Sequence, residues 1–264
     1  MEKLKKGGSF VKRLITALVL VPLTVGVLYY GSPFVEIMAL VFGGMMAWEW
    51  SNMVPNKRSS VYGVIYAAVT VWAVAANSFC AIFLVIFGAA LVVWLKAKDE
   101  AHRRLLTLGV FYISVGLGSL IWLYHLVGFY DTLWFLVMVW SMDIGGYLVG
   151  STVRGPKLAP KISPNKTWSG LLGGMALAAL VSMTLSYLFS SLDNRYFYAG
   201  LGAAVALVSQ IGDLAESAIK RYLGLKDSSN LIPGHGGAFD RIDGLIFSAP
   251  LVFLLFKYGI WFNM

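Results

Sequence analysis

The sequence predicts an all-α, polytopic integral membrane protein with about nine transmembrane helices. Hydrophobic residues make up 58% of the 264 residues and charged residues only 13%, whereas soluble domains usually carry about 25% charged residues. The nine Trp and 13 Tyr residues are typical of a chain with two lipid–water interfaces, where amphipathic rings lie at the level of the headgroups. These observations argue against an ordinary soluble domain.

The apolar residues fall into runs of roughly 20, the length that a helix needs to cross the hydrocarbon core. The N-terminal region, 1–130, holds runs at 12–31, 33–50, 60–77, 78–96 and 105–127. The C-terminal region, 131–264, holds runs at 131–150, 168–190, 196–215 and 244–262. Only Asn77 and Ser78 separate the third and fourth runs, so these form a tight hairpin or one of them is re-entrant. No small-residue cleavage site follows the first run, which indicates an uncleaved anchor.

The net charge of +8 is distributed in a way that favours a membrane over a nucleic acid as the partner. With the N-terminus in the cytoplasm, every Lys and Arg except Arg195 and Lys257 falls on or near the cytoplasmic side, as the positive-inside rule requires. The two longest polar loops, 151–167 and 217–243, then both face the cytoplasm, and we expect them to form one site. The expected location is a cytoplasmic (inner) membrane of bacterial type. The single cysteine excludes a disulfide framework.

The segment 217–243 and the two acids just before it form the most polar part of the chain, with five of the 13 acids. One face of the helix that ends near residue 220 carries, by its spacing, Ser209, Asp213, Glu216 and Lys220. Asp213 is expected close to the hydrocarbon boundary, where a carboxylate without a counter-charge is costly. Either a bound cation offsets that cost, or Asp213 forms a salt bridge with Lys220 or Arg221.

Asp240 and Asp243 stand three residues apart at the start of the last predicted helix. Their simpler role is to interact favourably with the positive end of the helix dipole. The alternative is that Asp240 faces Asp213 across a Mg²⁺ ion, since magnesium binds to one or two protein carboxylates and completes its shell with phosphate oxygens and water. The segment therefore predicts a magnesium site with phosphate chemistry.

Two glycines and a histidine precede these acids. Gly236 and Gly237 allow a sharp turn and can present N–H groups to an anion. His235 is either structural or catalytic, and its glycine neighbours and Asp240 make the two roles equal alternatives. A backbone anion site is therefore expected here.

The 151–167 loop has four bases and no acid. The positive-inside rule accounts for Arg154 and Lys157, whereas Lys166, followed by a Gly-rich helix start, is expected to contact phosphate. Asp143 lies deep in a predicted span, where an acid either serves function or forms a hydrogen bond with a neighbouring helix. We interpret as interfacial the polar residues near other helix ends, Glu36, Glu49 and His125.

Together these residues resemble the signature of phosphatidate cytidylyltransferases, also called CDP-diacylglycerol synthases. The resemblance rests on Ser217-x-x-Lys220-Arg221, Lys226-Asp227, Pro233-x-His235-Gly236-Gly237 and Asp240-Arg241-x-Asp243. A second matching stretch holds Asp143-x-Gly145-Gly146-Tyr147, Lys157-Leu-x-Pro160-x-Ile-Ser163-Pro164-x-Lys166-Thr167 and Gly173-Gly174. The resemblance is specific over residues 140–250. N-terminal to residue 140 it rests only on helix count and polarity.

The resemblance implies an enzyme that joins CTP to phosphatidate with the help of Mg²⁺, giving CDP-diacylglycerol and pyrophosphate for phospholipid synthesis. It implies catalytic roles for Asp213, Lys220, Arg221, His235 and Asp240, and metal binding by Asp213, Asp240 and Asp243. It implies substrate contacts by Asp143, Ser163, Lys166, Lys226, Asp227, Gly236, Gly237 and Arg241. The phosphate of phosphatidate is already an anionic nucleophile, so the main requirement is to stabilise charge on the leaving pyrophosphate. A second cation and a homodimer are left open.

Other functions fit parts of the pattern. A CTP-dependent polyprenol or phytol kinase shares the membrane and the nucleotide, but the full signature favours the cytidylyltransferase. A CDP-alcohol phosphotransferase would need an Asp-Gly-x-x-Ala-Arg core, whereas Leu245-Ile246-Phe247-Ser248 follows Asp243-Gly244. An ion-coupled transporter would use Asp143 and Asp213 as ion sites, yet no internal repeat of the kind such folds carry is evident. A scaffold without a substrate is least compatible with so many acids at one boundary.

Overall fold

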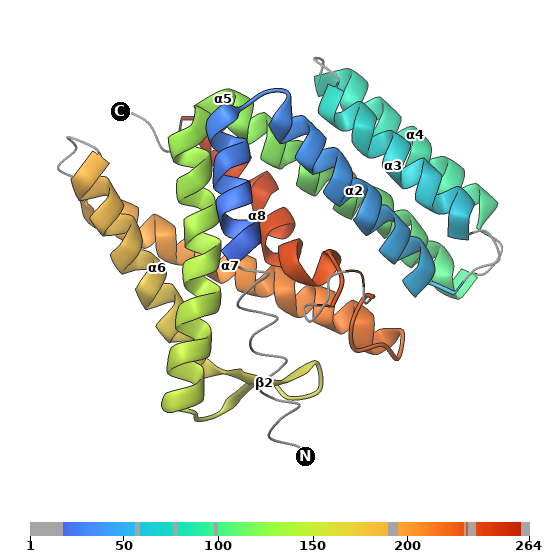
Figure 1. Cartoon of the computed structure of the whole chain (residues 1–264). Helices are drawn as coiled ribbons and strands as arrows, with labels where there is room; N and C mark the ends of the chain where they lie inside the picture. Colours follow the sequence, from blue (N-terminus) through green and yellow to red (C-terminus); the bar gives the residue numbers. More distant parts are fainter. Residues whose placement is uncertain are drawn as a thin grey trace. The chain divides into compact units, whose positions relative to one another are not determined.

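The computed structural model describes residues 18–55, 59–75, 79–97, 100–189, 195–229, 231 and 236–259, and nearly all of its regular structure is helical (Figure 1). A helix over Leu18–Tyr30 is followed by α2 (Phe34–Met53), α3 (Ser59–Ala75), α4 (Phe79–Lys96) and α5 (Glu100–Thr152). The strands β1 (Lys157–Ala159) and β2 (Ser163–Thr167) precede α6 (Trp168–Phe189), α7 (Arg195–Tyr222) and α8 (Phe239–Lys257). The predicted all-α class is confirmed, with one short hairpin added.

The long helix α5 contains two of the predicted spans. At Gly128 its backbone has φ 77° and ψ −159°, a conformation that glycine reaches without steric cost. The two predicted helices therefore meet at a kink and not at a loop. Two further boundaries agree with the prediction: the helix expected to end near residue 220 is α7, which ends at Tyr222, and α8 begins at Phe239, directly before Asp240. Polar residues of the signature thus lie on helices at both ends of the 217–243 segment.

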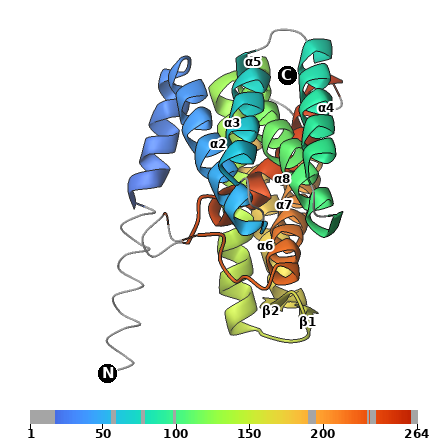
Figure 2. The same cartoon turned by 90° about the vertical axis from the view of Figure 1, so that its right-hand side faces the viewer.

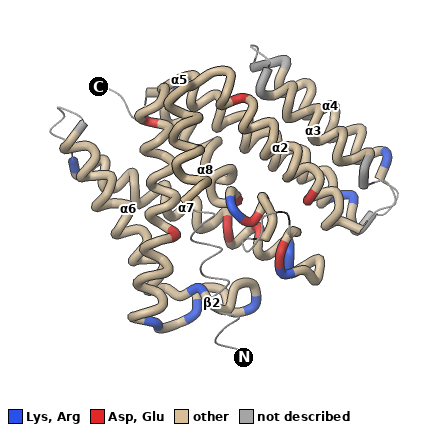
Figure 3. Tube along the Cα trace, viewed as in Figure 1, with Lys and Arg blue, Asp and Glu red and all other residues tan. Residues whose placement is uncertain are grey.

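Three described helices are long and apolar enough to cross a membrane, namely His102–Thr152, Trp168–Leu188 and Arg195–Tyr222. Shorter apolar helices cover Leu18–Tyr30, Val61–Ala73 and Ile82–Lys96. Many large apolar side chains are exposed, as in Leu84 at 74% and Tyr187 at 73%, and lipid is the natural neighbour of such surfaces. Figure 3 shows that α6 carries no Lys, Arg, Asp or Glu along its length. The count of nine spans and the cytoplasmic N-terminus stay predictions.

The chain divides into two compact units, of which the first comprises Met1–Ile121 and Leu225–Ile242. Within it α2 packs against α3, and α3 against α4 (Figure 2). The buried Trp50 of α2 stacks on Tyr112 of α5, with ring centroids 5.9 Å apart. It also contacts Phe239 at 5.3 Å, and its indole N–H donates to the carbonyl of Leu105 at 3.0 Å. This aromatic cluster packs the first residue of α8 against α2 and α5.

The second unit comprises Trp122–Gly224 and Asp243–Met264. Within it α6 packs against α7, and β2 contacts both helices. A Cβ on Gly145 of α5 would lie 2.8 Å from the carbonyl oxygen of Gly173, so small residues let α5 and α6 approach at backbone distance, as is common between membrane helices. The predicted loop 151–167 is in part an antiparallel hairpin, with Lys157 opposite Thr167 and Ala159 opposite Ser163.

Candidate active site

A close approach of α7 and α8 brings three acids together in the second unit. A Cβ on Gly212 would overlap the side chain of Phe247, and one on Gly244 would lie 3.0 Å from the carbonyl oxygen of Ser209. Because both glycines lack a side chain, the two helices can pack closely at this level. Asp213, Glu216 and Asp243 then offer carboxylate oxygens that all lie within 4.8 Å of one another. We call these three residues the acid cluster.

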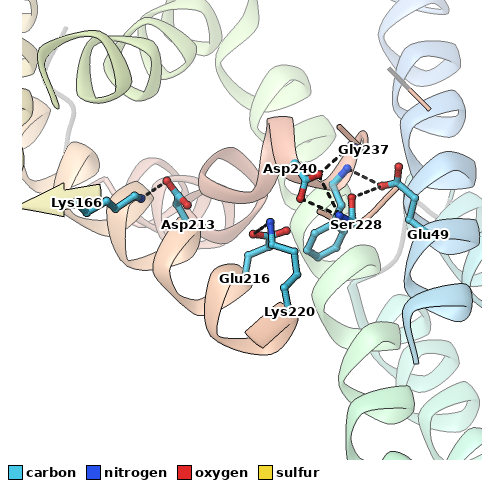
Figure 4. Close-up of polar contacts among 9 residues, drawn as sticks. Glu49, Lys166, Asp213, Glu216, Lys220, Ser228, Gly237 and Asp240 are labelled. Carbon is cyan, nitrogen blue, oxygen red and sulfur yellow. Dashed lines mark hydrogen bonds and ion pairs between the residues drawn. The ribbon is translucent and has the colours of Figure 1, made fainter. Parts of the chain in front are cut away.

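Two lysines pair with the acid cluster, as Figure 4 shows. Lys166 of β2 donates from Nζ to Oδ2 of Asp213. Lys220 forms an ion pair of 2.7 Å with Glu216 one helical turn earlier, and both side chains are buried. The lysine predicted to contact phosphate therefore lies against the carboxylate predicted to bind a metal. Lys166 can serve both anions, since an ammonium group has three donors on a flexible stem.

The third acid has a perturbed ionisation. Burial raises the pKa of the Asp243 carboxyl well above its usual range, and the nearby carboxylates of Asp213 and Asp143 raise this pKa further. A backbone hydrogen bond at Gly244 and the Lys166 ammonium act in the opposite direction. The negative charges of the acid cluster thus repel one another, and additional positive charge would favour the ionised form of Asp243.

The acid cluster fits a divalent cation by the chemistry of its donors. Hard cations such as Mg²⁺ are bound by carboxylate oxygens, and substrate phosphates and water commonly complete the shell. Asp213 and Asp243 were predicted as ligands, and both belong to the cluster. Glu216 is the third member, and its side chain is 1% exposed. Among the described residues this is the one group of acids that meets the spacing of a metal site.

Asp240, the remaining predicted ligand, lies in the first unit. Its carboxylate accepts hydrogen bonds from the backbone N–H of Gly237 at 2.9 Å and of Ser228 at 3.1 Å. A backbone anion site was predicted at the glycines. The Gly237 N–H at this site donates to the carboxylate of Asp240, so the anion bound there belongs to the chain itself. That Asp240 faces Asp213 across a metal ion stays a prediction.

The other predicted site residues take varied positions. Arg221 is exposed on the last turn of α7, and Ser163 is half-buried on β2. Three predicted site residues of the first unit have exposed side chains, namely Lys226, Asp227 and Arg241. Gly236 has a φ of 82°, in the left-handed region that favours glycine. His235 lies outside the described residues.

Two acids were not predicted as site residues. Glu216 was placed on the face of Asp213 by its spacing, and that spacing was the signal that it shares the cluster. Glu49 was interpreted as interfacial, which stays a prediction, but no site role was assigned to it, and its side chain is fully buried at 0% exposure. Its carboxylate accepts hydrogen bonds from residues about 180 positions away in the sequence, so no local pattern could reveal it.

Known proteins similar to this chain are found both as a family and as individual relatives. The model of the cytidylyltransferase family matches residues 11–259. A phosphatidate cytidylyltransferase of Brucella suis is 34% identical over 247 residues, which cover 92% of this chain and 91% of the relative. Proteins of the same name from Pseudomonas aeruginosa and Rickettsia bellii are 34% and 30% identical, over 95% and 97% of this chain and 98% and 94% of their own lengths.

Proposed function

The chain belongs to the cytidylyltransferase family, and from this membership we propose that it transfers the cytidylyl group of CTP to phosphatidate, giving CDP-diacylglycerol and pyrophosphate. The observation that carries the proposal is the acid cluster with its two paired lysines, in a chain that has helices long and apolar enough to cross a membrane. Relatives of similar length that are named phosphatidate cytidylyltransferases support the choice of the lipid. They also favour an enzyme over the alternative of an ion-coupled transporter.

In the proposed reaction an oxygen of the lipid phosphate attacks the α-phosphorus of CTP. The bond between that phosphorus and the bridging oxygen breaks, and pyrophosphate leaves with the electron pair. The lipid phosphate is already ionised near neutral pH, so the chain needs no strong general base. Its task is to bring two anions together and to stabilise the charge on the leaving group.

The side chains divide this task by their charge. Asp213, Glu216 and Asp243 would hold Mg²⁺, which when bound supplies positive charge to the phosphates. Lys166, Lys220 and Arg221 would contact phosphate oxygens and keep them in line. The resemblance adds roles for Asp240 as a metal ligand and His235 as a catalytic group, and both stay proposals. So do the substrate contacts assigned to Asp143, Ser163, Lys226, Asp227, Gly236, Gly237 and Arg241.

A pair of labelled substrates tests the proposed function. Purified protein is incubated with phosphatidate, Mg²⁺ and CTP labelled at either the α- or the γ-phosphate. Cytidylyl transfer puts the α-label into lipid and releases the γ-label in pyrophosphate, whereas a CTP-dependent kinase, given a polyprenol in a parallel incubation, puts the γ-label into that lipid. We expect only the α-labelled lipid, and γ-labelled lipid would instead assign the chain to the kinases.

We also propose that the acid cluster is reached from the cytoplasm, since CTP is a cytoplasmic nucleotide. The proposal predicts that Ser163 and Tyr196 lie on opposite sides of the membrane. Single cysteines at these positions, in a Cys80→Ser background, would be probed in intact cells with a thiol reagent that does not cross membranes. Only the cysteine at 196 should react, and reaction of the cysteine at 163 from outside would refute the proposed orientation.

A further inference from the structure

A second pair of carboxylates organises the signature segment within the first unit, and Figure 4 shows its contacts. Glu49 lies near the C-terminal end of α2, and Asp240 lies in the first turn of α8. Both carboxylates accept hydrogen bonds from the two ends of the stretch 228–239, which leads into α8. These ends are Ser228–Ser229 and Gly237–Phe239.

The contacts of Glu49 are divided evenly between its two oxygens. Oε1 accepts the backbone N–H of Ala238 at 2.9 Å and the hydroxyl of Ser229. Oε2 accepts the backbone N–H of Phe239 at 2.8 Å and lies 3.4 Å from the hydroxyl of Ser228. Each oxygen therefore takes one amide at the start of α8 and one hydroxyl from the other end of the segment. The positive end of the α8 dipole favours the negative charge of Glu49 at this place.

The two glycines of the segment are suited to these contacts. A Cβ on Gly237 would overlap Ser228 Oγ and Glu49 Oε1, so only glycine leaves room for the carboxylate. Gly236, with its φ of 82°, provides the turn that directs the following N–H groups inward. Next to Glu49, Trp50 packs against the ring of Phe239. Adjacent residues of α2 thus contact the start of α8 by hydrogen bonds and by ring packing.

We infer that Glu49 is a positioning residue. It holds the two ends of the stretch 228–239 together and thereby fixes the orientation of Asp240. Ser228 N–H and Gly237 N–H, which bind Asp240, belong to the same two ends that Glu49 joins. Removal of the Glu49 contacts would release both ends and with them the donors that orient Asp240. A helix that the signature does not include would in this way control the geometry of the signature. The inference rests on the proposed function, in which this segment serves the reaction.

Glu49→Gln is the sharpest test, because it keeps the shape of the side chain and removes one acceptor. Whichever way the amide turns, its NH₂ group faces the N–H of either Ala238 or Phe239, and two donors then oppose each other. We expect the turnover per folded molecule to fall about tenfold to a hundredfold, the range found when a group that orients a functional residue is removed. Glu49→Asp keeps both acceptor oxygens on a shorter stem and should recover part of the loss.

Glu36→Gln is the matched control, since it makes the same change in the first turn of the same helix, and it should retain wild-type turnover. A purely structural role of Glu49 predicts a different result, in which less folded protein is recovered but each folded molecule turns over normally. That result, or equal losses in the Gln and Asp variants, would overturn the inference. Should Glu49→Gln not fold, Ser229→Ala removes one donor to the same carboxylate at a residue without a proposed substrate contact; we expect a smaller loss of turnover, and turnover at the wild-type rate would overturn the inference.

Hydrogen exchange gives a readout that does not depend on the reaction. The amides of Ala238 and Phe239 donate to Glu49, so their exchange should accelerate at least about tenfold in Glu49→Gln, as for a backbone group that loses its acceptor. Exchange of these amides at the wild-type rate would overturn the inference even if the wild-type protein made no CDP-diacylglycerol. Absence of product from the wild type would by itself contradict only the proposed function.

Discussion

Asp213→Asn is expected to lower the turnover of CTP and phosphatidate by at least about a hundredfold, the loss typical when one major electrostatic group of a transition state is removed. Asp213 belongs to the acid cluster and pairs with Lys166. The amide keeps the size of the side chain but cannot supply a negative charge to a cation. The measurement is the initial rate of α-label transfer into lipid at saturating CTP.

The interpretation of Asp213→Asn depends on a folded variant. Glu216 and Lys220 remain paired in the buried core of the second unit, so the thermal midpoint should stay within a few degrees of the wild type, as for a substitution outside the packed core. A variant with normal thermal stability and a rate near that of the wild type would exclude Asp213 from the metal site. The next acids to substitute would then be Asp240, Asp143 and Asp227.

Removal of divalent cations is expected to abolish the reaction. Three carboxylates within 4.8 Å of one another repel when ionised, and an approaching triphosphate adds further negative charge. With excess EDTA the rate should fall below about a hundredth of the Mg²⁺-supported rate, since the charge on the leaving pyrophosphate loses its main stabilising group.

The control for the chelator experiment is recovery, because EDTA must act only by removing the ion. Mg²⁺ added in excess over EDTA should restore the full rate within the time of mixing. Full activity in EDTA would end the metal hypothesis and leave Lys166, Lys220 and Arg221 as the groups that stabilise the pyrophosphate.

The fold was predictable to the extent that apolar runs determine it. Every predicted run is helical over all but one or two of its described residues, since a backbone in lipid must form its own hydrogen bonds. A break between the runs that end at 127 and begin at 131 was predicted, but its form as a kink at Gly128 was not, because glycine is also common within uninterrupted membrane helices. The β1–β2 hairpin was missed because its prolines and lysines give no alternation of apolar and polar residues, the usual signal of a strand.

The candidate site was predictable where its geometry is local. The spacing of Asp213 and Glu216 on one helix face put two members of the acid cluster together, and Asp243 was recognised at the start of α8. Pairings between distant segments could not be deduced in this way. Lys166 forms an ion pair with Asp213, which is 47 residues away in the sequence. Glu49 accepts a hydrogen bond from the N–H of Phe239, which is 190 residues away. Such pairs depend on how the helices pack, and hydropathy alone does not specify that packing.

Direct binding of Mn²⁺, followed by electron paramagnetic resonance of the purified protein without CTP, tests the metal centre most directly. The chelator experiment alone would also respond to an ion carried only by the nucleotide. We expect the wild type to bind Mn²⁺ in competition with Mg²⁺, and Asp213→Asn and Asp243→Asn to lose this binding. Lys166→Met, which breaks the same ion pair but keeps every carboxylate, should still bind the ion. Equal Mn²⁺ binding by the wild type and both acid variants would contradict the assignment of the acid cluster as the metal centre.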